Sequence, residues 1–177
     1  ISTSRRQFLG GMGLAAFAFP SLIKAAGTGG KVHHACIGVG GMGWNDLQNF
    51  KSHPDVEIVA LCDVDANHLE RARKELPNAR VYRDWRELLG KEADRVDSVN
   101  VTVPDHMHAA IGLAALRAGK HVYCQKPTCH DIAEVRAMNR VSEERKLVTQ
   151  LGTQAASGFG DRLAVHVMRQ KMLGKIT

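Results

Sequence analysis

Residues 32–43 read VHHACIGVGGMG, a short apolar stretch that runs into the pattern G-x-G-x-x-G. Residues 31–37 predict a β-strand, and the stretch after the glycines predicts a helix, with Leu47 and Phe50 on one face, that ends before Pro54. Three glycines alone are weak evidence, because turns commonly need glycine. Placed between a strand and a helix, they are typical of a dinucleotide-binding βαβ unit.

Each residue of the glycine motif has an expected role in holding a dinucleotide. Gly38 allows the tight turn out of the strand, Gly40 lets the backbone approach a pyrophosphate, and Gly43 lets the helix pack closely on the strand. Gly41 and Met42 lie between them at the start of the helix, where unpaired N–H groups face the phosphates. We therefore predict that all five residues contact the cofactor.

A second predicted strand, residues 56–62, ends at Asp63, which lies 25 positions after Gly38. That spacing is close to the one expected for the acid that binds the adenosine ribose. A carboxylate there accepts hydrogen bonds from the ribose hydroxyls and repels a 2′-phosphate. Asp63 therefore favours NAD over NADP as the cofactor, and the alternative is an ordinary aspartate at a strand end.

Strands and helices continue to alternate along the rest of the chain, which predicts an α/β protein with a doubly wound parallel sheet, the Rossmann arrangement. In the strand expected at 97–103, Val99 and Val101 share one face while Asn100 and Thr102 share the other. The further strands are expected at residues 80–82, 121–124 and 147–151. The further helices are expected at 65–76, at 85–89 (closed by Gly90), at 105–118 and at 162–172, and one more begins at Asp131, which forms a capping box with Glu134.

Two strand ends carry the remaining candidate site residues. The strand at 97–103 has Thr102 near its end and is followed by Pro104 and His108, and the strand at 121–124 is followed by Lys126 and Pro127. The carboxyl ends of the strands in such a sheet border the ligand crevice. Lys126 can point its amine at a bound sugar or nicotinamide, and the alternative is a solvated surface lysine.

These stretches together resemble the N-terminal half of the Gfo/Idh/MocA oxidoreductases. The matching segments are Gly38–Gly43, Leu61–Asp65, Pro104–His108, Ala118–Val122 and Lys126-Pro127. The resemblance covers residues 32–152 and the first helix of the family's second domain. The family motif at the lysine is usually Glu-Lys-Pro, so Gln125 is a departure from it.

The resemblance implies an NAD- or NADP-dependent oxidoreductase that acts on a sugar, polyol or related compound, and the export signal described below favours tightly bound NAD. It places Lys126 beside the nicotinamide and the substrate, as a catalytic residue that assists proton transfer and also contacts the cofactor. It places His108 near the cofactor, and the alternative is a histidine that bonds locally. The family's further acid–base residues lie beyond Thr177. Two other functions stay open: an NAD-dependent glycoside hydrolase that oxidises its sugar transiently, and a non-catalytic nucleotide-binding fragment.

Residues 1–30 predict a twin-arginine signal peptide, because Arg5 and Arg6 precede a weakly apolar run. The expected location is therefore periplasmic or secreted, and export of an already folded protein favours a retained cofactor. We expect residues 31–152 to form the NAD-binding domain. Residues 153–177 are expected to begin a truncated, α+β substrate domain, so the chain is treated as a fragment.

Composition narrows the partners. The chain has 177 residues, 44% hydrophobic and 24% charged, which is the balance of a globular protein. Its net charge is +6, but residues 1–30 hold three basic residues and no acid, so the remainder carries +3. This small net charge, together with only 5% aromatic residues, argues against a nucleic-acid partner.

The histidines and four cysteines show no metal-ligand or disulfide spacing. Membrane contact is expected only during export, and a homo-oligomer is expected at full length.

Overall fold

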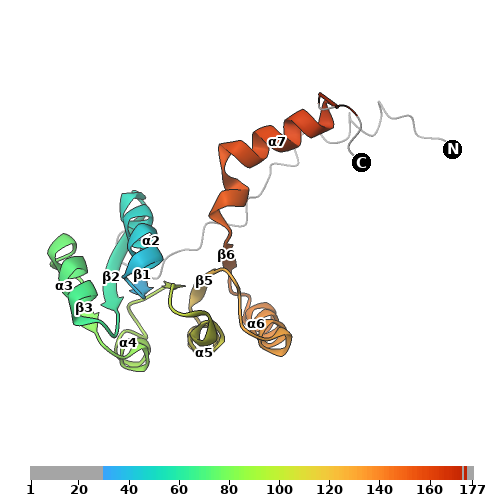
Figure 1. Cartoon of the computed structure of the whole chain (residues 1–177). Coiled ribbons are helices and arrows are strands. Elements are labelled where there is room, and N and C mark those ends of the chain that lie inside the picture. The colour runs from blue at the N-terminus through green and yellow to red at the C-terminus, as the bar shows by residue number, and fades with distance from the viewer. Residues whose placement is uncertain (1–29, 173, 175–177) are drawn as a thin grey trace.

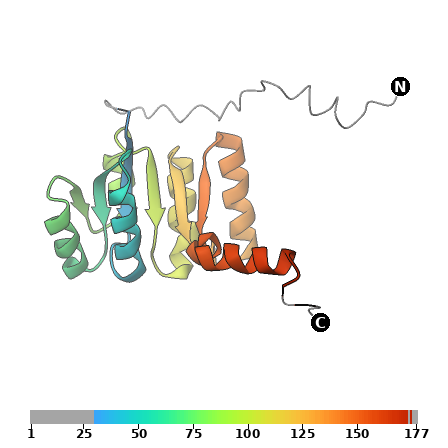
Figure 2. The ribbon, with the colours of Figure 1, turned by 90° about the horizontal axis from the view of Figure 1, so that it is seen from above.

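The computed structural model describes residues 30–172 and residue 174, so almost all of the predicted signal peptide lies outside the described residues. Six strands form one sheet in the order β3-β2-β1-β4-β5-β6, and every neighbouring pair is parallel (Figures 1 and 2). This order confirms the predicted doubly wound α/β fold. The strands are β1 Val32–Ile37, β2 Val56–Cys62, β3 Arg80–Tyr82, β4 Ser98–Val101, β5 His121–Gln125 and β6 Thr149–Gly152.

Helices connect the strands close to the predicted positions. Asp65 caps α3 through the N–H of Asn67, and the predicted capping box of Asp131 and Glu134 at α6 is confirmed. The helix predicted to close at Gly90 ends one residue later, at Lys91, and the N–H of its C-cap Glu92 bonds to the carbonyl of Leu88. The helices are α2 Gly41–Ser52, α3 Ala66–Glu75, α4 Trp85–Lys91, α5 His108–Arg117, α6 Ile132–Arg145 and α7 Phe159–Arg169, with 3₁₀ turns η1 Asp105–Met107 and η2 Gln154–Ser157.

Helices cover both faces of the sheet (Figure 1). On one face, α2 and α3 pack against β1 and β2 around Leu47, Leu61 and Leu69. On the other face, α4, α5 and α6 pack against the sheet, with Val99 and Ile111 fully buried in the larger core. Burying apolar side chains on both faces is what holds a parallel sheet together.

The face of β4 turned toward α2 is polar, as the alternation of residues in that strand predicts. Val99 and Val101 point into the larger core, whereas Asn100 bonds to His34 of β1 and to Thr102. Asn100 is fully buried, so these hydrogen bonds satisfy polar groups that water cannot reach. A polar network therefore runs across the middle of the sheet.

Beyond β6, η2 leads into α7, which leaves the sheet at its edge (Figures 1 and 2). The apolar side chains of Phe159, Leu163 and Met168 on α7 are exposed. The prediction that residues 153–177 begin a second domain stays a prediction. Among the helices within residues 30–172, none combines the length and the apolar character that crossing a membrane requires.

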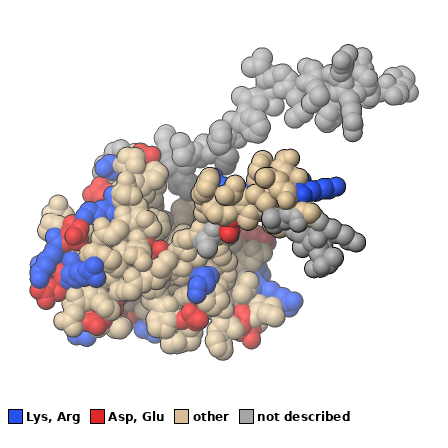
Figure 3. Space-filling view, turned by 45° about the horizontal axis from the view of Figure 1, so that its top comes forward, with Lys and Arg blue, Asp and Glu red and all other residues tan. Residues whose placement is uncertain are grey.

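Charged side chains of both signs mix on the face shown in Figure 3. Lys51 pairs with Glu75, and Lys74 pairs with Glu70 one helical turn away. Such exposed pairs contribute little to stability, but they leave this part of the surface without a uniform charge.

Candidate functional site

The strand order reverses between β1 and β4, and a pocket of about 640 Å³ opens at the carboxyl ends of the strands there. Ligands of open α/β sheets bind at this switch point. Among its lining residues are five that the sequence predicts as cofactor-binding: Gly38, Gly40, Asp63, Thr102 and Pro104. The structure therefore brings together residues from the ends of three strands.

Two glycines of the motif are required by close backbone contacts. Gly38 has a φ of +84°, and a Cβ there would lie 2.0 Å from the carbonyl oxygen of Thr102. A Cβ on Gly43 would lie 2.1 Å from the carbonyl oxygen of Gly38. The roles predicted for a tight turn and for close helix packing agree with this geometry.

Helix α2 begins at the glycine loop without a side-chain cap. Its N-cap is Gly40, and no side chain there accepts a hydrogen bond from the first turn. Gly41 and Met42 are exposed at this end of the helix. The N–H of Gly43 bonds to the carbonyl of Gly40, so the main-chain N–H groups of Gly41 and Met42 are the ones that can meet a negatively charged ligand.

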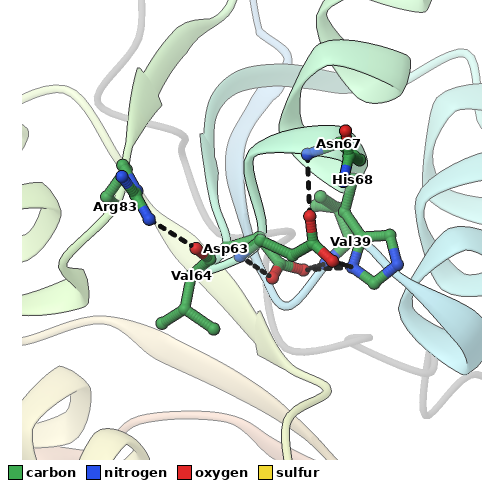
Figure 4. Close-up of polar contacts among 7 residues, drawn as sticks. Val39, Asp63, Val64, Asn67, His68 and Arg83 are labelled. Carbon is green, nitrogen blue, oxygen red and sulfur yellow. Dashed lines mark hydrogen bonds and ion pairs between the residues drawn. The ribbon is translucent and has the colours of Figure 1, made fainter.

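Asp63 is held at the end of β2 by two main-chain donors. Its Oδ2 accepts the N–H of Val39 at 2.8 Å, and its Oδ1 accepts the N–H of Asp65 at 3.0 Å (Figure 4). Each oxygen keeps a second lone pair. The carboxylate is thus oriented by the loop it supports and can still accept hydrogen bonds from a ligand.

His68 and Arg83 are among the pocket residues that the sequence analysis missed. The His68 Nδ1 lies 3.6 Å from Asp63 Oδ2 (Figure 4). The His68 ring also occupies the space beside Gly40, where a Cβ would lie 2.3 Å from it. Arg83 donates to the carbonyl oxygen of Val64 at 3.0 Å. Neither residue belongs to a motif, so only the packing of α3 and the turn after β3 brings them to the site.

Lys126 follows β5 directly, and its side chain is exposed. Strand β5 pairs with β4, so Lys126 lies at the carboxyl edge of the sheet, one strand beyond the switch point. It is not among the residues that line the pocket. The preceding residue, Gln125, is buried, as expected for neighbours whose side chains point to opposite faces.

His108 is buried at the start of α5, only 1% exposed. Its Nδ1 lies 2.5 Å from the carbonyl oxygen of Pro127, and its Nε2 lies 2.9 Å from that of Val103. Both ring nitrogens thus face main-chain carbonyls within the fold. This geometry favours the local hydrogen-bonding alternative over a direct contact with a cofactor, and it ties the segment after Lys126 to the end of β4.

The cysteines are buried thiols rather than reactive ones. Burial raises the pKa of Cys62 and of Cys124 to about 12, and that of Cys129 to about 11. All four are free. Within residues 30–172, no group of three or more His, Cys, Asp or Glu side chains is arranged to hold a metal ion.

The geometry fits a dinucleotide. A side chain at Gly38 or Gly43 would clash with the main chain around the loop, and the N-terminus of α2 has no side-chain cap. The Asp63 carboxylate lies at the end of β2, where it can accept hydrogen bonds from a ribose. The fold and site together define a Rossmann-type dinucleotide-binding domain. A family profile described as "Oxidoreductase family, NAD-binding Rossmann fold" matches residues 32–153. The chain therefore belongs to the Gfo/Idh/MocA family.

Individual relatives are sugar and polyol enzymes by name. The chain is 33% identical over 110 residues to a myo-inositol 2-dehydrogenase of Thermotoga maritima, covering 62% of this chain and 31% of that protein. It is 29% identical over 158 residues to a glycosyl hydrolase family 109 protein of Solibacter usitatus, covering 84% of this chain and 36% of that protein. The chain spans about a third of the length of the curated relatives it matches.

Solved structures share the same fold. The crystal structure of myo-inositol 2-dehydrogenase from Lactobacillus plantarum superposes with a TM-score of 0.75 at 27% identity, covering 82% of this chain and 43% of that one. A scyllo-inositol dehydrogenase from Lactobacillus casei with bound NAD(H) and scyllo-inositol gives 0.74 at 26% identity, covering 83% and 43%.

Proposed function

We propose that the natural full-length protein is an NAD-dependent oxidoreductase that acts on a hydroxyl group of a sugar, polyol or related compound. The observation that carries this proposal is the position of Asp63 beside the glycine loop, where both its oxygens are fixed by main-chain N–H groups. A carboxylate at this place favours a ribose with a free 2′-hydroxyl, and therefore NAD over NADP. Relatives named as inositol and apiose dehydrogenases support the substrate class.

Oxidation of an alcohol removes a hydride from carbon and a proton from oxygen. Bound NAD supplies the hydride acceptor. Lys126, exposed at the carboxyl edge of the sheet, supplies an amine that binds the hydroxyl or assists the transfer of its proton. Thr102 and Pro104 form the wall of the cofactor pocket, and the residues of the glycine loop hold the pyrophosphate.

A second candidate function is NAD-dependent glycoside hydrolysis with transient oxidation of the sugar. The observation that favours it is the glycosyl hydrolase family 109 relative of Solibacter usitatus, whose match covers 84% of the chain. The two activities differ in their use of the cofactor. A dehydrogenase accumulates NADH with each turnover, whereas such a hydrolase releases its product without net NADH.

We further propose that residues 1–30 direct export by the twin-arginine route to the periplasm or beyond. The support is the pair Arg5-Arg6 in front of a weakly apolar run. A retained NAD suits a protein that is exported already folded. In the same proposal, residues 153–177 begin the substrate domain, and the full-length protein assembles as a homo-oligomer.

The test is to incubate the purified full-length protein with NAD and a panel of inositols, aldoses and aryl glycosides. NADH formation and release of the aglycone are followed in parallel, and NADP replaces NAD in a second series. NADH formation with a sugar or polyol supports the dehydrogenase, and aglycone release without it supports the hydrolase. If the protein carries no nucleotide when purified and also fails to bind NADH in a fluorescence titration, both functions are overturned.

A further inference from the structure

Asp46, in the middle of α2, is a buried carboxylate that no part of the proposed function uses. Asp46 is only 2% exposed, and hydrogen-bond donors from three separate segments of the chain converge on its carboxylate. Thr102 donates to Oδ2 at 2.7 Å, Gln125 donates to both oxygens at 2.9 and 3.1 Å, and Gln154 donates to Oδ1 at 3.3 Å. A buried carboxylate with this many donors is satisfied as an anion.

The direction of the neighbouring hydrogen bonds agrees with a negative charge on Asp46. The single hydroxyl hydrogen of Thr102 goes to Asp46, so Thr102 Oγ1 accepts from the Asn100 amide at 2.9 Å. The Asn100 oxygen then accepts from His34 Nε2 at 3.1 Å. Every donor in this chain therefore points toward Asp46. Burial raises the pKa of Tyr123, and the charge of Asp46 raises it further.

Gln125 is the residue that departs from the Glu-Lys-Pro motif, and its contacts explain the departure. It is 5% exposed, and its amide nitrogen reaches both oxygens of Asp46. A glutamate at this position could not donate, so two carboxylates would face one another without water. Gly152 leaves room for this side chain, because a Cβ on Gly152 would lie 2.7 Å from Gln125 Oε1.

The place of Gln125 gives this contact a consequence for the site. Gln125 pairs with Gly152 in the sheet and directly precedes Lys126. Gln154, which also donates to Asp46, lies just after β6. A single carboxylate on the helix that follows the glycine loop thus joins the strand end that carries Lys126 to the segment that leaves the sheet.

We propose that Asp46 and Gln125 form a matched acceptor–donor pair, in which Asp46 carries the negative charge that the glutamate of the Glu-Lys-Pro motif would carry. The pair is a positioning device: it fixes the end of β5, and with it Lys126, against α2. Its effect on turnover rests on the proposed function, whereas its effect on folding does not.

The test is a charge swap in the natural full-length protein. Gln125→Glu and Asp46→Asn each break the pair, and the double variant restores it with the charge on the other side. Each single variant should melt about 10 °C or more below the parent. Each should also lose about 10²-fold in kcat, with a smaller change in KM, because Lys126 is displaced. The double variant should regain most of both losses.

The pH dependence separates a charge effect from a packing effect. In Gln125→Glu two carboxylates compete for one site, so its melting deficit should shrink on acidification as they share a proton. Asp46→Asn has no second carboxylate, so its deficit should stay constant down to about pH 5, above the range in which an ordinary aspartate takes up a proton. Gln150→Glu is the matched control, since it makes the same exchange at an exposed position of β6 and should melt like the parent.

A double variant that melts no higher than the worse single variant would overturn the pairing, whatever the activity. If a single variant yields no folded protein, recovery of folded protein in the double variant counts as rescue. Melting rescued without rescue of kcat, in an active parent, would overturn the positioning of Lys126. A parent that shows the melting pattern but no NAD-dependent turnover would refute the proposed function and leave the pair standing.

Discussion

The carboxylate of Asp63 accepts the main-chain N–H of Val39 at 2.8 Å, and this contact ties the end of β2 to the loop between β1 and α2 (Figure 4). One side chain therefore both shapes the glycine loop and presents an acceptor to the pocket. Loss of Asp63 should therefore have two effects: it should disturb the geometry of the glycine loop, and it should weaken the discrimination against the 2′-phosphate of NADP. Substitutions can separate them.

Asp63→Asn keeps an oxygen that can accept the Val39 N–H, but it removes the negative charge and the oxygen that accepts the Asp65 N–H. We expect it to narrow the preference for NAD over NADP by about tenfold, since repulsion of the 2′-phosphate is lost. Asp63→Ala loses the acceptor as well and should weaken NADH binding by about 10- to 100-fold. Fluorescence titration with NADH and NADPH, after removal of any nucleotide that co-purifies, measures both effects.

The control for this series is Glu144→Gln, which removes an exposed negative charge from α6, away from the pocket. It should leave both affinities unchanged. Equal affinity of the parent protein for NADH and NADPH would remove the basis for the role assigned to Asp63.

His34 should make the fold sensitive to acid. Burial lowers the pKa of His34 to about 4, although a hydrogen bond from its ring to Asn100 opposes the shift. Unfolded chains take up this proton near pH 6.5, whereas the folded protein does so only near pH 4. The free energy of unfolding should therefore fall as the pH drops from about 6.5 to about 4, by on the order of 3 kcal/mol from this group.

Urea unfolding of the full-length protein at several pH values between about 7 and about 4 measures this slope. His34→Asn should flatten it, because the titrating group is gone. His130→Asn, at an exposed position, serves as the control and should keep the slope of the parent. An unchanged slope in His34→Asn would show that other groups cause the acid sensitivity.

Local sequence rules were sufficient for the framework. The alternation of Val99 and Asn100 follows from the period of two along a strand, and the capping box at Asp131 follows from a spacing of three residues. The position of Asp63 after a strand is equally local. These features were predicted because each depends on residues that are near one another in the chain.

The contacts that the sequence analysis missed are long-range. Asp46 and Gln125 are 79 residues apart, and nothing in the helical stretch around Asp46 marks it as the centre of a polar network. Helix α4 ends at Lys91, one residue past Gly90, and its C-cap Glu92 is buried and bonds to Arg80 and Tyr82 of β3. A local rule about glycine contains no information on such contacts between separate elements.

Export should depend on the arginine pair. Substituting Arg5→Lys together with Arg6→Lys should keep the full-length protein in the cytoplasm, because the twin-arginine route requires this pair. The exported parent should purify with a nicotinamide dinucleotide already bound. Cell fractionation locates the protein, and chromatography of the supernatant after denaturation detects the nucleotide. A cofactor-free protein that is active without added NAD would contradict the expectation of a retained cofactor.

Lys126 should matter for turnover more than for cofactor binding. It follows β5 at the carboxyl edge of the sheet, whereas the pyrophosphate and ribose are expected at the glycine loop and Asp63. Lys126→Ala should therefore lower kcat by about 10²–10⁴-fold, the usual range for general acid–base assistance, and leave the Kd for NADH within about threefold. Lys126→Arg should not restore the rate, because a guanidinium does not release a proton near neutral pH.

Lys31→Ala is the matched control for Lys126→Ala, since this exposed lysine precedes β1 at the opposite edge of the sheet. Near-normal turnover of Lys126→Ala, measured with full-length protein and saturating NAD, would leave Lys126 as a surface residue without a role in the reaction.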